Sequence, residues 1–97
     1  MTIKKTELDG VFLITPKIIK DIRGHFFESF KSDSFSQSLI PTKFAQENQS
    51  LSKKGTLRGL HYQLNYPQGK LVSVSKGCVV DFAIDIRVGS STFGKSL

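Results

Sequence analysis

Alternating apolar and polar residues predict a chain built mainly of short β-strands. The clearest alternation runs over residues 79–88, where every second residue is large and apolar: Val80, Phe82, Ile84 and Ile86. The residues between them form a more polar face, as expected for a half-buried strand. The same period, or a short run of β-forming residues, predicts further strands at residues 11–14, 25–30, 44–49, 56–63 and 70–75.

One segment departs from this pattern and predicts a short helix at residues 32–39. Ser32 or Asp33 is the expected N-cap, because short polar side chains accept hydrogen bonds from the first free backbone N–H groups. Pro41 is the expected stop. Turns rich in Gly and Pro separate the predicted strands, and no internal repeat or linker is visible. The pattern therefore predicts one all-β domain over residues 1–97, a sandwich or a barrel.

The stretch at residues 56–63, Thr-Leu-Arg-Gly-Leu-His-Tyr-Gln, holds the densest group of chemically active side chains. Strict alternation places Arg58 and His61 on opposite faces of a strand. Gly59 lies between them, and a glycine inside a strand often marks a bulge or a close backbone approach. A kink there could turn Arg58 toward His61 and form a site. The stretch alone fits an ordinary strand with a hydrogen-bonded core histidine better than a site.

Two other strand faces carry polar residues that suit a ligand. Glu28 lies between two aromatic residues at 26 and 30, and a solvated edge strand explains it equally well. Gln46 and Asn48 share one face of the strand predicted at 44–49. A solvated face is the commoner explanation for such a pair.

Charge and cysteine content narrow the function classes. The net charge of +6 and the pI near 9.7 allow nucleic-acid binding. The Lys and Arg residues are scattered, however, so a basic lining for one small anionic ligand fits equally well. The single cysteine, Cys78, excludes an internal disulfide framework and agrees with a reducing compartment, and its β-rich setting predicts a buried structural thiol. With no secretion signal or membrane-spanning stretch visible, we expect a cytoplasmic protein that binds no membrane.

Six sequence blocks in a fixed order carry a family resemblance. They are residues 21–24, 46–50, 54–63, 68–72, 81–87 and 91–95. Together they resemble the dTDP-4-dehydrorhamnose 3,5-epimerases, which are RmlC-like cupins, and the Arg-Gly-Leu-His-Tyr-Gln sequence is the most specific part. The resemblance covers essentially the whole chain but only the N-terminal half or so of the family.

The resemblance implies a cupin-type jelly-roll β-sandwich, incomplete on its C-terminal side, with at most one short helix. It also implies an isomerase of dTDP-rhamnose biosynthesis whose substrate is a dTDP-4-keto-6-deoxysugar. The reaction removes and returns a proton at the carbons flanking the ketone. Such a C–H group becomes acidic enough only when the developing enolate oxygen is stabilised and a base is within reach.

The resemblance also assigns roles to residues of the stretch and its neighbours. His61 matches the base of the family, and a neutral imidazole, the side chain whose unperturbed pKa is ~6.5, can accept a proton near neutral pH. Lys70 matches the cation that supports the enolate oxygen. Arg58 matches a substrate contact, and Gln46 and Asn48 match nucleotide contacts.

Two further matches imply a homodimer with exchanged N-terminal strands. Arg23 and Glu28 match residues that reach the nucleotide from the neighbouring subunit. No metal or other cofactor is expected, because metal-binding cupins usually carry two His one residue apart, followed by a carboxylate. The corresponding sequence here is His61-Tyr62-Gln63, and one imidazole with an amide is a poor transition-metal set.

Several positions of the family have no counterpart in these residues: the tyrosine that returns the proton, the aspartate that orients the base and a further histidine. Asp81 and Asp85 match other positions, and Ser73 stands where relatives often carry a basic residue. We therefore expect little or no epimerase activity from the 97 residues alone, with a dimer or further chain needed to cover the apolar face at 80–86.

Two other function classes remain open. One is a catalytically degenerate cupin that still binds dTDP-sugars through Arg23, Glu28, Asn48 and Arg58. The other is a small basic β-barrel that binds single-stranded nucleic acid through aromatic stacking and scattered lysines. It leaves the six ordered blocks unexplained, so nucleic acid is not the expected partner.

Overall fold

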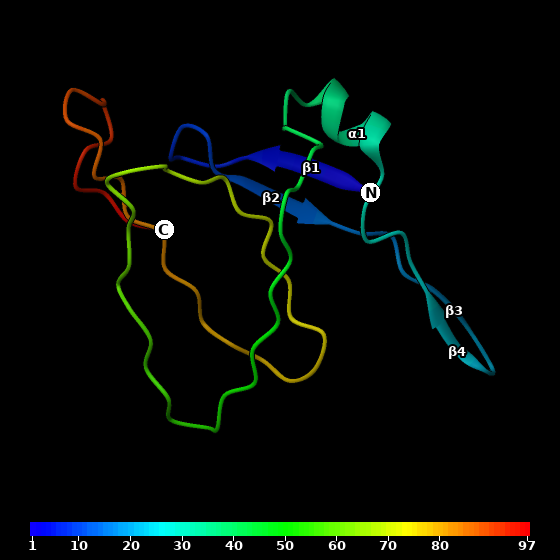
Figure 1. Cartoon of the computed structure of the whole chain (residues 1–97). Helices are drawn as coiled ribbons and strands as arrows, with labels where there is room; N and C mark the ends of the chain where they lie inside the picture. Colours follow the sequence, from blue (N-terminus) through cyan, green and yellow to red (C-terminus); the bar gives the residue numbers. More distant parts are fainter. The chain divides into compact units, whose positions relative to one another are not determined.

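The computed structural model describes all residues 1–97, and its regular structure is mainly β. The elements are β1 (Thr2–Lys5), β2 (Phe12–Thr15), β3 (Ile19–Asp21), β4 (Gly24–Phe26) and α1 (Ser32–Gln37), as Figure 1 shows. Short strands with one short helix agree with the predicted all-β class. The strands form two separate two-stranded ladders and no closed barrel. No helix has the length and hydrophobicity that crossing a membrane requires.

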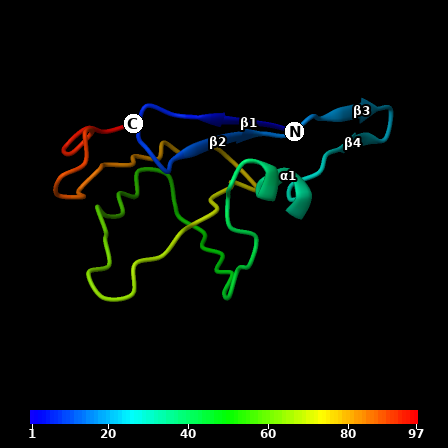
Figure 2. The same cartoon turned by 90° about the horizontal axis from the view of Figure 1, so that it is seen from above.

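The chain divides into two compact units. The first unit comprises Met1–Ala45 together with Asp81–Leu97, and the second unit comprises Gln46–Val80. All regular elements belong to the first unit. The second unit contains turns but no helix and no strand, and Figures 1 and 2 trace it as a loop coloured green to yellow.

The first hairpin pairs β1 with β2 in antiparallel register, from Thr2 opposite Thr15 to Lys5 opposite Phe12. Its turn is held by Thr6, whose Oγ1 donates to the carbonyl of Val11 at 2.8 Å and accepts from the backbone N–H of Leu8 at 3.2 Å. Leu8 is buried in this turn. The strand predicted at 11–14 is confirmed with a shift of one residue.

The second hairpin pairs β3 with β4 around a turn at residues 21–24, the first of the six sequence blocks. Asp21 closes this turn, because its Oδ1 accepts from the backbone N–H of Arg23 at 2.8 Å. The strand predicted at 25–30 is only partly formed, since β4 ends at Phe26.

Helix α1 begins at Ser32, as the sequence predicts, but its expected N-cap is wrong and it ends two residues earlier than expected. The N-cap is Lys31, in extended conformation, and it makes no side-chain capping bond. The helix ends at Gln37, four residues before Pro41. Two carbonyls of the last turn accept backbone hydrogen bonds from the residues that follow the helix. The N–H of Leu39 donates to the Ser36 carbonyl at 3.0 Å, and the N–H of Ile40 donates to the Phe35 carbonyl at 2.9 Å. With Leu39 at φ +60, this is a Schellman motif built on leucine instead of glycine.

An aromatic cluster forms the main apolar core of the first unit. Phe35 of α1 is completely buried, and its ring meets Phe30 edge-on at a centroid distance of 4.8 Å. Phe30 in turn meets Phe44 edge-on at 5.9 Å. Edge-to-face pairs at these distances are favourable beyond the area they bury. The residues around α1 are therefore held by aromatic packing more than by helix propensity.

The strand predicted at 79–88 is wrong. Only an isolated antiparallel bridge forms, between Ile84 and Ser96, although Ala83 and Leu97 exchange two backbone hydrogen bonds at 3.1 and 2.8 Å. The predicted apolar face is not a core, because Phe82 is 63% exposed and Ile86 is 51% exposed. The opposite face carries the buried residue instead, Asp85.

The strands predicted at 44–49, 56–63 and 70–75 are also wrong. A strand needs a neighbour for its backbone N–H and C=O groups, and these segments take part in no strand pairing. Cys78 was expected to be buried in such a strand, and it is exposed.

Candidate active site

The segment at 56–63 is an irregular loop of the second unit whose sharpest feature is at Gly59. This glycine has φ +93, a conformation that L-residues rarely adopt. A Cβ added to it would lie 3.3 Å from both the backbone N and the ring Nδ1 of His61. The predicted close approach at Gly59 is therefore confirmed. The neighbour that it accommodates is His61, and no strand bulge is involved.

Arg58 is directed into the preceding loop instead of toward the histidine. Its Nε donates to Ser52 Oγ at 2.9 Å, and its side chain is exposed. No hydrogen bond joins it to His61, so the kink at Gly59 does not bring these two groups together. The guanidinium keeps its Nη groups free to bind an anion.

Gln46 and Asn48 do lie together, as the sequence predicted. Gln46 Nε2 donates to Asn48 Oδ1 at 3.0 Å, and both residues are exposed. The bond leaves the Gln46 carbonyl and the Asn48 amino group unused, which is one acceptor and one donor group on neighbouring side chains. Such a pair can recognise a group that both donates and accepts, as the edge of a nucleobase does.

His61 and Lys70 are both exposed and neither makes a side-chain hydrogen bond. The structure does not join them to each other or to Arg58. The expected reactive groups of the second unit are therefore accessible to a substrate but are not assembled by direct contacts.

Arg23 and Glu28 belong to the first unit. The Arg23 guanidinium donates two hydrogen bonds to Asp21 Oδ2, from Nη2 at 2.7 Å and from Nε at 3.2 Å. These bonds hold the pKa of the Asp21 carboxyl below its usual range. Glu28 is exposed and lines a hollow of about 160 Å³ with Phe26, Lys17 and two further residues. The solvated alternative for Glu28 agrees with this exposure.

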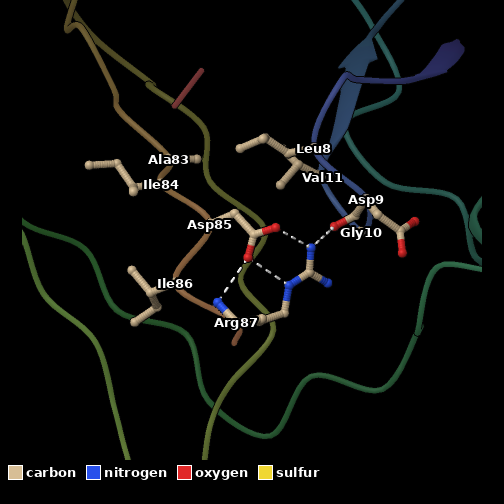
Figure 3. Close-up of a pocket in the computed structure, with 9 residues that line it drawn as sticks. All are labelled: Leu8, Asp9, Gly10, Val11, Ala83, Ile84, Asp85, Ile86 and Arg87. Carbon is tan, nitrogen blue, oxygen red and sulfur yellow. Dashed lines mark hydrogen bonds and ion pairs between the residues drawn. The ribbon is translucent and has the colours of Figure 1, made fainter. Parts of the chain in front are cut away.

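A polar cluster around Asp85 was not anticipated from the sequence. It lies in the first unit beside the β1–β2 turn, and Figure 3 shows Asp85 and Arg87 facing each other while Ile84 and Ile86 point away. Asp85 Oδ1 accepts from the backbone N–H of Arg87 at 3.0 Å and from its Nε at 2.9 Å. Oδ2 accepts from Arg87 Nη2 at 3.0 Å.

Two hydroxyl groups complete the Asp85 cluster. Ser90 Oγ and Thr92 Oγ1 each donate to Asp85 Oδ2 at 2.6 Å. The side chain of Asp85 is only 1% exposed. The hydrogen bonds from Arg87, Ser90 and Thr92 hold the pKa of the Asp85 carboxyl far below its usual range, so it stays ionised.

The Asp85 carboxylate is a poor proton acceptor, because its oxygens are already hydrogen-bonded. Its bonds instead hold the surrounding loop in place. Five donors occupy its two oxygens, which leaves little capacity for a substrate proton or an imidazole. It therefore does not supply the base-orienting aspartate that the sequence lacks. The sequence signal for the cluster was an Asp-x-Arg pair followed by two hydroxyl residues, which strand alternation alone does not reveal.

Comparison with known proteins decides the relationship that the six blocks suggested. The family model for dTDP-4-dehydrorhamnose 3,5-epimerase matches residues 5–97. The chain belongs to this epimerase family.

Two relatives that carry the name dTDP-4-dehydrorhamnose 3,5-epimerase illustrate the match. The one from Shigella flexneri is 50% identical over 97 residues, which is 98% of this chain and 54% of the relative. The one from Methanothermobacter thermautotrophicus is 45% identical over 91 residues, 94% of this chain and 49% of the relative.

The chain thus spans about half the length of these epimerase relatives. No solved structure gives a significant match. Within this epimerase-family chain, the expected site residues divide between the two units: Arg23 and Glu28 in the first, the other five in the second. No three or more His, Cys, Asp or Glu side chains gather as a metal centre would need.

Proposed function

We propose that this chain provides the base-bearing part of a dTDP-4-dehydrorhamnose 3,5-epimerase acting in dTDP-rhamnose biosynthesis. The observation that carries the proposal is the family match over residues 5–97, which includes the Arg-Gly-Leu-His-Tyr-Gln segment. The exposure of His61 supports it, because a general base must be accessible to the carbon that it deprotonates.

In the proposed reaction, His61 takes a proton from a carbon next to the C4 ketone of a dTDP-4-keto-6-deoxysugar. The C–H bond breaks, an N–H bond forms, and the electron pair delocalises onto the ketone oxygen as an enolate. The ammonium group of Lys70 stabilises this charge. A general acid from outside these 97 residues, the role of the tyrosine that the resemblance implies, then donates a proton to the opposite face of the carbon and inverts its configuration, and His61 releases its proton to water. Because one proton leaves and one returns, the reaction is redox-neutral and needs no electron carrier.

The remaining expected residues would hold the nucleotide. Gln46 and Asn48 offer a donor and an acceptor side by side, which suits the thymine edge. Arg58 has free Nη groups for the diphosphate, and the net charge of +6 favours an anionic substrate. Arg23 and Glu28 would reach the nucleotide of a second subunit, so the proposal includes a homodimer with exchanged N-terminal strands.

The proposed fold is a single cupin-type jelly-roll domain to which this chain contributes one part, in a cytoplasmic protein. Its support is the exposed apolar stripe at residues 80–86, which resembles one face of a sheet that lacks its second layer. The segments at 56–63 and 70–75 would become strands when such a layer supplies backbone partners. This assembly would also bring His61 and Lys70 toward one pocket.

The test uses a hybrid in which this chain replaces the matching residues of the Shigella flexneri relative. The hybrid is incubated with the 4-keto sugar nucleotide in deuterated water, and deuterium at C3 and C5 is followed by NMR. We expect exchange at both carbons, its loss in His61→Asn, and a strong reduction in Lys70→Met. The matched control is His25→Asn, because His25 is the only other histidine that this chain contributes to the hybrid. It should exchange like the parent hybrid.

A second outcome is a degenerate binder of dTDP-sugars, which the lack of contacts among His61, Lys70 and Arg58 favours. Calorimetric titration of the hybrid with dTDP separates the two. A hybrid that binds dTDP but exchanges no proton contradicts the epimerase proposal and supports the degenerate binder. A hybrid in which His61→Asn exchanges as fast as the parent contradicts the role of His61.

A further inference from the structure

We propose that the Asp9–Gly10 peptide is a site of spontaneous isoaspartate formation and that the Arg87 guanidinium promotes the reaction. The two residues lie in the turn between β1 and β2, and both are exposed. The guanidinium reaches them from another segment of the same unit, where Arg87 Nη2 donates to the Asp9 carbonyl at 2.9 Å (Figure 3). This modification is independent of the function proposed above.

The reacting groups of this turn are free of other partners. The Asp9 carboxylate makes no hydrogen bond, and the Gly10 N–H takes no part in the hydrogen bonds that hold the turn. Gly10 has φ +84, in the region that favours glycine, and it carries no side chain that could obstruct attack by its nitrogen. A nucleophilic nitrogen and the carboxyl carbon that it attacks therefore lie on adjacent, exposed residues.

Arg87 is placed to increase the acidity of the Gly10 N–H group. The Gly10 nitrogen and the Asp9 carbonyl oxygen belong to one conjugated peptide group, so removal of the N–H proton spreads negative charge onto that oxygen. The Arg87 donor already points at the oxygen where this charge develops. A Cβ added to Gly10 would lie 3.8 Å from Arg87 Nη1, so the guanidinium lies beside Gly10 as well.

Asp85 keeps the guanidinium in this position. Its Oδ1 accepts from Arg87 Nε at 2.9 Å, and its Oδ2 accepts from Arg87 Nη2 at 3.0 Å. Asp85, and to a smaller extent the Asp9 carboxylate, hold the pKa of the Arg87 guanidinium above its usual value, so the donor stays charged. The cation is thus fixed by a residue that does not itself react.

The reaction closes a ring and opens it again, with no net change in composition. The Gly10 nitrogen loses its proton to solvent and attacks Asp9 Cγ. A C–N bond forms, a Cγ–O bond breaks, and the oxygen leaves as water to give a succinimide. Water then adds to the main-chain carbonyl of Asp9, which Arg87 polarises, and the bond from that carbon to the Gly10 nitrogen breaks. The chain now runs through the Asp9 side chain, and the former carbonyl is a free carboxylate that pairs with Arg87.

The test follows isoaspartate in the 97-residue chain during incubation at neutral pH. Its amount is measured by methyl transfer from S-adenosylmethionine with an isoaspartyl methyltransferase, and electron-transfer mass spectrometry locates it in the sequence. We expect isoaspartate to accumulate at Asp9, and Arg87→Met to slow its formation by on the order of 10-fold. This is less than the roughly 10²–10³-fold effect of a buried oxyanion-hole donor, because the Arg87 side chain is 54% exposed.

Two further variants and one condition separate this role from a structural one. Arg87→Lys keeps the charge but loses the fork that binds Asp85, so its rate should lie between those of the parent and Arg87→Met. Lys5→Met removes an exposed cation of β1 that makes no bond to Asp9, and it should react like the parent. In concentrated urea the parent and Arg87→Met should react at equal rates, because unfolding separates residues 9 and 87.

Three results would overturn the inference: an Arg87→Met chain that forms isoaspartate as fast as the parent or faster, a rate difference that persists in urea, or no isoaspartate at residue 9 of the folded parent. An arginine that only held the turn would predict a faster reaction in Arg87→Met, since a looser turn closes the ring more readily. Lower stability of this variant therefore cannot imitate the predicted result.

Discussion

Asp85 and Asp21 make the same local arrangement in different surroundings. Each precedes an arginine by two residues, accepts that arginine's backbone N–H, and pairs with its guanidinium. The Asp85 side chain is 1% exposed, whereas that of Asp21 is 48% exposed. Water competes for the exposed pair and screens it, so its contribution to stability is small. The buried carboxylate depends on its partners to remain ionised.

We expect Asp85→Asn to open the loop at residues 85–95 at neutral pH, and Asp21→Asn to have little effect. An amide presents N–H groups where donors already converge, so buried donors lose their acceptor. The amide resonance of Gly94, which donates to the Asp85 carbonyl at 2.7 Å, reports the loop by NMR. A variant with the parent Gly94 resonance would show that the cluster does not hold the loop.

The same carboxylate gives this loop a defined acid dependence. The pKa of Asp85 in the folded chain lies well below its unfolded value of about 4. Its stabilisation is therefore complete above about pH 4 and is lost as the pH falls from there toward the folded pKa. The Gly94 resonance of the parent should weaken over that acidic range. In Asp85→Asn it should show no such pH dependence.

The C-terminus of helix α1 is closed by a Schellman motif in which a leucine, Leu39, stands where a glycine is preferred. Leu39 occupies the left-handed position that glycine usually fills, at φ +60, and it is 88% exposed. A left-handed L-residue costs roughly 1–2 kcal/mol. The helix keeps this arrangement because Phe35 is buried against Phe30 and anchors the preceding turn.

We expect Leu39→Gly to raise the free energy of unfolding by up to about 1 kcal/mol, since removal of the strain exceeds the entropy that glycine adds to the unfolded state. Urea denaturation followed by circular dichroism measures the change. Leu51→Gly is the control, because Leu51 is 93% exposed but is not among the residues with positive φ. It should be neutral or slightly destabilising. A loss of stability in Leu39→Gly would contradict the strain argument.

Local elements were only partly predicted from the sequence, since β1 and β3 were missed, and elements that need distant partners were not predictable. The signals for α1 and for the turn at 21–24 lie within a few residues: an apolar side with polar neighbours, or an Asp near a Gly. Strand alternation at 56–63 and 79–88 describes a face but supplies no backbone partner. The strands predicted there therefore did not form.

In the candidate active site too, the sequence predicted contacts between residues close in the chain and missed or misplaced the others. Gln46 and Asn48 meet because they are two residues apart, and Gly59 approaches His61 for the same reason. Bringing Arg58 to His61 would require a regular strand with a bulge, which is absent. The Asp85 cluster was missed because alternation assigned Asp85 to a polar face, whereas its five hydrogen bonds allow it to be buried.

At the scale of the whole molecule, buried apolar side chains are few. Leu8 and Phe35 are the buried apolar residues, while large residues such as Tyr62, Val80 and Phe82 are mostly exposed. Soluble proteins rarely leave so much apolar surface uncovered, and such surfaces mark contact sites. A complementary β-layer, as proposed above, is the kind of partner that this surface fits.

We expect the isolated chain to bind the dye ANS strongly and the hybrid with the Shigella flexneri relative to bind it weakly. ANS reports accessible apolar surface that lacks fixed packing. Fluorescence at equal protein concentration gives the comparison, and a dilution series shows whether self-association covers the surface. Weak ANS fluorescence of the chain at every concentration would contradict the exposed stripe at 80–86. Equal fluorescence of both proteins would contradict the proposed second layer.

The bond from Arg87 Nη2 to the carbonyl of Asp9, 2.9 Å long, links positions 78 residues apart. During synthesis the N-terminal hairpin leaves the ribosome well before the residues that fasten it, since chains emerge at roughly 5–20 residues per second. Closing so long a loop costs entropy that local turns do not, so this bond belongs to a late stage of folding. Until then the nascent β1–β2 turn has a carbonyl at Asp9 that lacks this partner.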